Sequence, residues 1–158
     1  MMFLTVGSQM PFDRLVKSVD AWATRNPSAT LFAQIGKSDY RPQAMEWVHL
    51  LGPEKYRKRF LEADLIISHA GMGTVITAAD YGKRLIVMPR REGLGETRNN
   101  HQIATAKWLP DHFGICVAMD DTDMMRALDG WPGIVPCEST NADAKNDLVT
   151  VLSKFINS

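Results

Sequence analysis

The sequence predicts an α/β fold, a Rossmann-like doubly wound parallel sheet, on the basis of three observations. Short continuous apolar runs recur along the chain, as in strands that are buried on both faces. Amphipathic segments with helical spacing separate these runs, and right-handed crossovers then place helices on both sides of the sheet. The chain has 158 residues, 45% of them hydrophobic. This is enough to bury roughly 70% of the unfolded surface, so we expect a single domain over residues 1–158.

The first half of the chain supplies three predicted strands and two predicted helices. The strands are expected at residues 2–6, 30–35 and 46–51. Apolar residues at intervals of three or four between Phe12 and Trp22 predict the first helix. Pro53 suits a first helical position and begins the second, whose apolar face contains Tyr56, Phe60 and Ala63.

The second half repeats this alternation. Strands are predicted at residues 65–67, 85–88 and 114–118. Helices are predicted at residues 74–81, around Ile103, Ala106 and Leu109, and at the C-terminus around Leu148, Leu152 and Phe155. Residues 130–141 form the one long irregular connection that we expect.

Composition excludes several classes of protein. Lys and Arg number 18 and so do Asp and Glu, which argues against non-specific nucleic-acid binding. No apolar run approaches the ~18 residues that span a bilayer, and the N-terminus lacks signal-peptide features. Cys116 and Cys137 cannot make a disulfide framework, and no His or Cys shows metal-ligand spacing. We therefore expect a cytoplasmic protein without a metal ion.

Polar loops follow three predicted strands, at the sheet edge where open α/β sheets bind ligands. They cover residues 7–9, 68–74 and 90–102. In the second loop, Gly71 and Gly73 let backbone amides approach a ligand, and the following helix start suits a phosphate. A tight strand-to-helix turn without a ligand explains the same glycines, and a solvated surface loop explains the third segment.

Two further motifs could bind a ligand, but each also has a purely structural explanation. The Asp121-Thr122-Asp123 sequence resembles an acidic metal-binding motif, but it stands where Asp commonly caps a helix. A basic run could touch an anionic surface, although a solvated helix face is the explanation that we favour from sequence. This run consists of Lys55, Arg57, Lys58 and Arg59.

Taken together, four groups of residues over positions 2–109 resemble glycosyltransferase family 28, specifically its C-terminal half. They are FLTVGS at 3–8 with FDRL at 12–15, ISHAGMGT at 67–74, GKRLIVMPR at 82–90, and NNHQ at 99–102. The resemblance implies the C-terminal half of a GT-B fold and a nucleotide-sugar-binding domain whose donor is a UDP-sugar. It implies no metal and no other cofactor.

The same resemblance implies a partner, because only the donor half of the enzyme is present. The chain is similar to the small subunit of split transferases, of the bacterial exopolysaccharide type and the related eukaryotic dolichol-pathway pair. We expect a membrane-anchored acceptor-binding subunit that brings a lipid-linked sugar acceptor and the general base for an inverting transfer. The chain would then be peripheral at the inner face of the membrane through that partner. The predicted C-terminal helix is expected to carry the docking surface, through which the isolated chain can also self-associate.

Donor-binding residues follow from the resemblance by position. Gly7 and Ser8 would lie near the diphosphate. The phosphate and the nucleoside would be held by His69, Ala70, Gly71, Met72, Gly73 and Thr74. His101 and Gln102 would bind the donor sugar. The same pocket would be lined by Arg90, Arg91, Glu96 and Asn100.

One position departs from the family pattern. Many members place a glutamate three residues after the Thr or Ser of the turn, where it grips the ribose; here this residue is Thr77. Either Thr77 makes a weaker contact or Glu96 supplies the carboxylate. Alternative functions are a non-catalytic nucleotide-sugar-binding module, a nucleotide-sugar hydrolase or epimerase, and a structural oligomer with a vestigial pocket.

Overall fold

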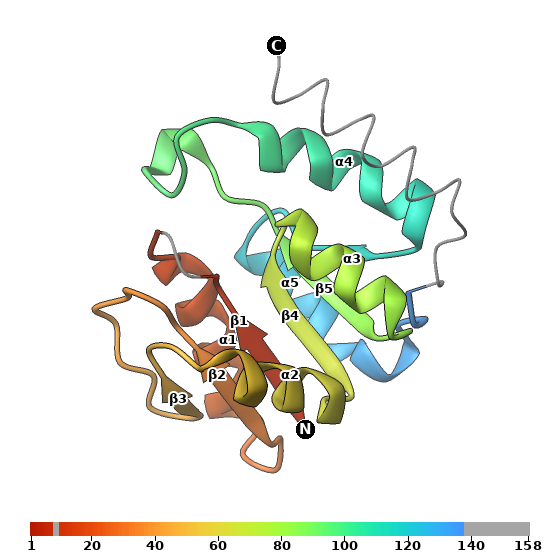
Figure 1. Ribbon diagram of the computed structural model, residues 1–158. Coiled ribbons are helices and arrows are strands. Elements are labelled where there is room, and N and C mark those ends of the chain that lie inside the picture. Colours follow the sequence, from red (N-terminus) through yellow and green to blue (C-terminus); the bar gives the residue numbers. More distant parts are fainter. Residues whose placement is uncertain (8–9, 138–158) are drawn as a thin grey trace.

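A computed structural model describes residues 1–7 and 10–137, and its centre is a six-stranded sheet (Figure 1). Every strand pairs in parallel with its neighbours, in the order β3-β2-β1-β4-β5-β6. The strands are β1 (Met2–Thr5), β2 (Leu31–Gln34), β3 (Glu46–Val48), β4 (Leu65–His69), β5 (Arg84–Met88) and β6 (Cys116–Val117). The predicted Rossmann-like doubly wound parallel sheet is confirmed.

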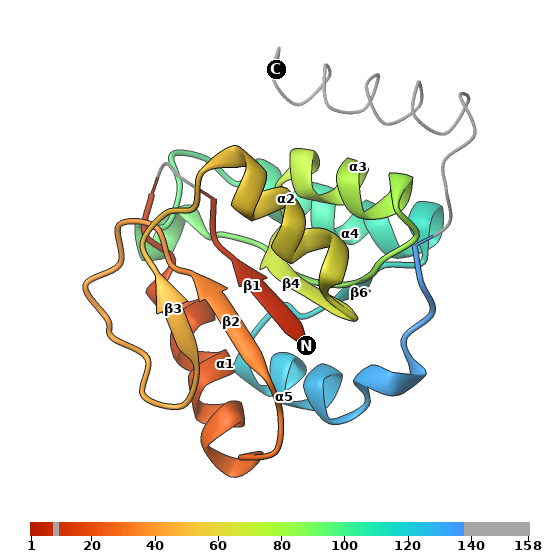
Figure 2. The ribbon, with the colours of Figure 1, turned by 60° about the horizontal axis from the view of Figure 1, so that its bottom comes forward.

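Helices cover both faces of this sheet (Figure 2). One face carries α1 (Asp13–Arg25) and α5 (Asp121–Asp129), and the other carries α2 (Pro53–Glu62), α3 (Met72–Asp80) and α4 (His101–Phe113). Short 3₁₀ helices occur at Glu92–Leu94 and Trp131–Gly133. None of these helices has the length and the apolar composition that a bilayer-spanning segment requires.

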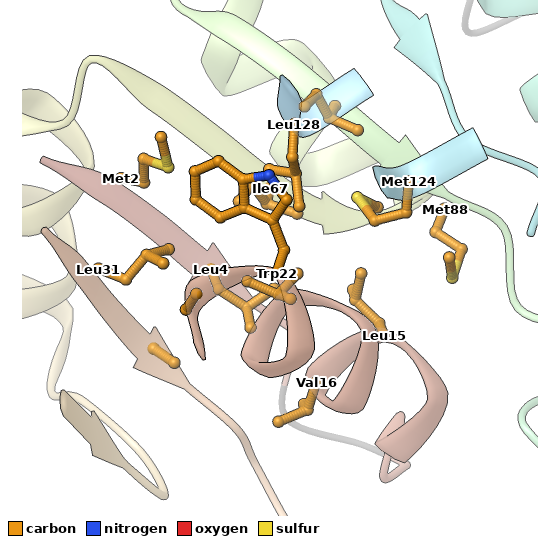
Figure 3. Packing of buried hydrophobic residues seen from close by; sticks show 14 of the residues in the cluster. Met2, Leu4, Leu15, Val16, Trp22, Leu31, Ile67, Met88, Met124 and Leu128 are labelled. Carbon is orange, nitrogen blue, oxygen red and sulfur yellow. The ribbon is translucent and has the colours of Figure 1, made fainter. Parts of the chain in front are cut away.

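Two apolar cores result, one on each side of the sheet. On the α1 side, Trp22 lies between the sheet and α5 and is only 4% exposed (Figure 3). Its indole Nε1 donates to Oδ1 of Asp129 at 2.8 Å, which satisfies the one polar atom that the ring buries. The amphipathic pattern of α1 therefore decides which face of the helix enters this core.

The predicted elements are confirmed with small shifts at their ends. The third and sixth strands end earlier than predicted, and α3 begins at Met72, two residues before the predicted start. Asp120 caps α5 by accepting from the N–H of Asp123 at 2.8 Å, and Asp123 accepts from the N–H of Met119, which favours the capping explanation for this acidic motif. The predicted C-terminal helix and Ser8 lie outside the described residues.

The strand order determines where a ligand can bind. The chain proceeds outward from β1 to β2 and β3, then returns to the other side of β1 to continue with β4, β5 and β6. Connections from β1 and β4 therefore leave the sheet in opposite directions, which opens a crevice at their carboxyl ends. The glycine-rich loops after β1 and β4 meet at this crevice.

Candidate functional site

A cavity of about 370 Å³ opens at the carboxyl ends of β1, β4 and β5. Its walls come from the three loops that the sequence singled out. The lining residues are Val6, Gly7, Met10, His69, Gly71, Met72, Gly73, Thr74, Arg90, Glu96, Thr97 and Gln102. Nine of these were predicted as donor-binding residues, and only the fold brings them together.

Arg90 is a buried cation at this cavity, only 5% exposed. Its guanidinium donates to the carbonyl oxygens of Val6 at 2.5 Å, Pro11 at 3.1 Å and Glu96 at 3.1 Å. It also lies 4.8 Å from the centre of the Phe12 ring. Burial lowers the pKa of Arg90, and the charge of Glu96 opposes that shift. Arg90 thus ties the loop after β1 to the loop after β5 and places positive charge beside the cavity.

Glu96 is held by Arg14 in a two-pronged ion pair. Nε and Nη2 of Arg14 lie 2.9 Å from Oε2 and Oε1 of Glu96, and Nη2 also donates to the carbonyl of Pro89 at 2.9 Å. Oε1 accepts a further bond from the N–H of Arg91 at 3.0 Å. Because both oxygens already have partners, the Glu96 carboxylate first of all fixes the loop after β5.

Gln102 determines the proton position on His69. Its Oε1 accepts from the backbone N–H of Arg90 at 3.0 Å, and this N–H can only donate. The amide nitrogen of Gln102 therefore faces Nδ1 of His69, at 3.2 Å, and can only donate in turn. Nδ1 must accept, so the proton of the neutral ring is on Nε2. His69 then offers an Nε2–H donor on the side of Gly7 and Gly71.

The ring of His69 is neutral at physiological pH. Desolvation by burial and the nearby charge of Arg90 lower the pKa of His69 to about 4. A neutral imidazole can donate one hydrogen bond to an anion without titrating between pH 6 and 8.

The two glycines of the second loop have different reasons to be glycine. A Cβ on Gly71 would lie 2.3 Å from Cε1 of His69, so any side chain there would displace the imidazole ring. A Cβ on Gly73 would meet nothing within 4 Å. Packing thus explains Gly71, whereas the open space at Gly73 is available to a ligand.

The same loop begins helix α3, whose first residues line the cavity. Within the described chain, no side chain caps this end of the helix. The first backbone N–H groups of a helix lack intrahelical partners and carry the positive end of the helix dipole. The cavity wall therefore offers several N–H donors to an anion.

Five predicted site residues are described but do not line the cavity. Ala70 is buried, and the Thr77 hydroxyl donates to the carbonyl of Gly73 at 2.8 Å while its side chain borders a separate hollow. Arg91 reaches the carbonyl of Met119, and the Asn100 side chain accepts from the N–H of Glu92. His101 is the first residue of α4.

The cavity also contains residues that the sequence reasoning did not select. Val6, Met10 and Thr97 line it, while Phe12 and Arg14 support its loops. Phe12 and Arg14 stood in the FDRL motif, so the motif signalled them without a role. Nothing in the spacing distinguished Met10 or Thr97 from other loop residues.

Comparison with known proteins relates this geometry to a family. The model of the glycosyltransferase family 28 C-terminal domain matches residues 1–126. A search of curated proteins found no match.

Solved structures share the fold at low sequence identity. An NMR structure of ALG13 is 17% identical, with a TM-score of 0.62 and coverage of 89% of each chain. MurG of Acinetobacter baumannii is 22% identical with a TM-score of 0.59, over 84% of this chain and 42% of its own. The glycotransferase of kitacinnamycin is 18% identical with a TM-score of 0.59, over 95% of this chain and 38% of its own.

The chain thus spans about two fifths of the length of MurG and of the kitacinnamycin enzyme. The family match covers most of the sequence, including the three loops that form the cavity. The chain belongs to glycosyltransferase family 28, and it corresponds to the C-terminal domain of that family.

Proposed function

We propose that this chain binds the UDP-sugar donor for a two-component inverting glycosyltransferase. The observation that carries the proposal is the cavity at the β1–β4 crevice, with three kinds of hydrogen-bond donor on its walls. These donors are the buried Arg90 guanidinium, the neutral His69 Nε2–H and the uncapped start of α3. Such a set suits a diphosphate.

In the proposed reaction, these hydrogen-bond donors stabilise the leaving group. An acceptor hydroxyl oxygen attacks the anomeric carbon of the sugar, and the bond from that carbon to the β-phosphate oxygen breaks. UDP leaves with the electron pair, and the hydroxyl proton passes to a general base. The fixed donors stabilise the charge that grows on the β-phosphate, and we propose that they do so without a metal ion.

The general base and the acceptor site are proposed to belong to a partner. By family likeness, this partner is a membrane-anchored subunit that presents a lipid-linked sugar, as in exopolysaccharide synthesis.

Calorimetric titration with UDP, ADP and GDP in EDTA tests the donor site. Selective binding of UDP is expected, and absence of binding in the presence of the partner would exclude a donor role. Incubation with UDP-sugar alone tests the competing functions, because a hydrolase or epimerase converts the donor without an acceptor. We expect no such conversion, and we expect sugar transfer to require the partner.

A further inference from the structure

Outside the cavity, one surface of the protein concentrates unpaired positive charge on helix α2. Lys55, Arg57 and Lys58 are exposed, and no ion pair or hydrogen bond joins their side chains to any described residue. Arg59, one residue further, lies 4.0 Å above the ring of Phe32. Since the chain has no net charge, this clustering is a local feature and not a consequence of composition.

Exposed apolar side chains border the same helix. Five large hydrophobic side chains are exposed in the described part of the chain, and three of them are near α2. Leu50, just before the helix, is 64% exposed, Leu61 within it is 38% exposed, and Tyr81 at the end of α3 is 45% exposed. We call the exposed face formed by these three residues with Lys55, Arg57 and Lys58 the α2 surface.

Hollows with apolar floors flank α2 on both sides. Figure 2 shows α2 beside α3 on one face of the sheet, with β3 at the sheet edge. The hollow toward β3, about 470 Å³, is lined by Phe32, Val48, Leu51, Lys55, Lys58, Arg59 and Glu62. The hollow toward α3, about 370 Å³, is lined by Tyr56, Arg57, Phe60, Leu61, Thr77 and Tyr81. Each hollow therefore brings apolar side chains and cations together.

We propose that the α2 surface binds an anionic phospholipid bilayer. Headgroup phosphates attract Lys and Arg, and apolar and Tyr side chains enter the boundary between headgroups and acyl chains. A protein partner fits less well, because the buried centres of protein interfaces are depleted in Lys and have few charges. This contact belongs to the chain itself, and it goes beyond the membrane association that the proposed partner would provide.

Co-sedimentation of the purified chain with vesicles tests the proposal. Vesicles of phosphatidylcholine alone are compared with vesicles that also contain phosphatidylglycerol, at about 0.1 M and about 1 M salt, where the Debye length falls from about 10 to about 3 Å. Binding to the anionic vesicles is expected at the lower salt concentration, with little binding to neutral vesicles. The K55E/R57E/K58E variant should lower the partition coefficient by roughly a hundredfold, because each cation near an anionic surface contributes about 1 kcal/mol.

A matched control reverses three charges elsewhere. The R25E/K107E/R126E variant changes the net charge equally but leaves α2 intact, so it should keep most of the binding. Thermal unfolding of both variants verifies that each is folded. The proposal is overturned if the folded wild-type chain ignores anionic vesicles, binds neutral ones equally well, or loses binding equally in the two variants. None of these results depends on whether the chain binds UDP.

Discussion

Gln102 donates to Nδ1 of His69 at 3.2 Å, and this contact decides which ring nitrogen is protonated. The backbone N–H of Arg90 fixes the orientation of the Gln102 amide, so a main-chain group determines the tautomer of a side chain in the cavity. A family comparison alone suggested that Gln102 binds the sugar. Its amide oxygen and one amide hydrogen are used within the protein, so Gln102 positions His69, and its contact with the sugar stays a prediction.

The first prediction concerns Gln102→Glu. A carboxylate can accept from Arg90 N–H and from His69 Nδ1–H together, and it stabilises the imidazolium. The pKa of His69 should then rise well above its value of about 4 in the wild-type protein. Nitrogen-detected NMR titration of the histidine rings measures both the pKa and the tautomer. Asn100→Asp adds the same charge without touching His69 and should shift that pKa much less. An Nδ1–H tautomer in the wild-type protein would contradict the assignment.

The second prediction is a pH dependence of stability. Because folding lowers the pKa of His69 from 6.5 to about 4, the unfolded chain binds more protons in this interval. This contribution to stability is therefore present above pH 6.5 and is lost as the pH falls toward 4. The loss between pH 7 and pH 4 should be about 2 to 3 kcal/mol.

His69→Gln isolates this contribution from those of other groups. Denaturant unfolding of both proteins between pH 7 and pH 4 measures the difference between their free energies of unfolding. The wild-type protein should lose more stability than the variant on acidification. Parallel curves would mean that the ring is protonated equally in both states.

The third prediction compares two ion pairs. Arg14→Ala leaves the Glu96 carboxylate, 9% exposed, without its main partner, and should destabilise the protein by about 3 kcal/mol. Arg126→Ala removes an exposed pair with Asp123 at 3.5 Å and should cost less than about 1 kcal/mol. Unfolding in urea measures both. Equal effects would show that the Arg14–Glu96 pair does not fix the loop.

The fourth prediction separates packing from ligand binding at two glycines. Gly71→Ala places a Cβ 2.3 Å from the His69 ring and should destabilise the protein by about 1 to 3 kcal/mol. Gly73→Ala meets no neighbouring atom and should leave stability unchanged or raise it by up to about 1 kcal/mol. If the ligand approaches Gly73, that variant nevertheless binds UDP more weakly. Calorimetric titration beside thermal unfolding distinguishes these effects, and unchanged UDP affinity in Gly73→Ala would place the ligand elsewhere.

Much of this fold could be predicted because its signals are local. The apolar run at β4 and the helical spacing from Phe12 to Trp22 each reflect burial of neighbouring residues, so a short window contains the information. Strand ends were less predictable: β6 extends only from Cys116 to Val117 because its length depends on pairing with β5. Hydrogen-bond partners in a sheet are remote in sequence.

The cavity likewise combines features that were predictable from local sequence with features that were not. Local apolar spacing predicted which loops follow the strands, and the alternation of strands and helices predicted a parallel sheet whose carboxyl ends gather these loops. Three features arise only in the folded chain: Glu96 pairs with Arg14 across 82 residues, the Thr77 hydroxyl donates to the carbonyl of Gly73, and burial keeps His69 neutral. Contacts of this kind depend on distances between remote segments and on the loss of water around them, and neither is encoded in local spacing.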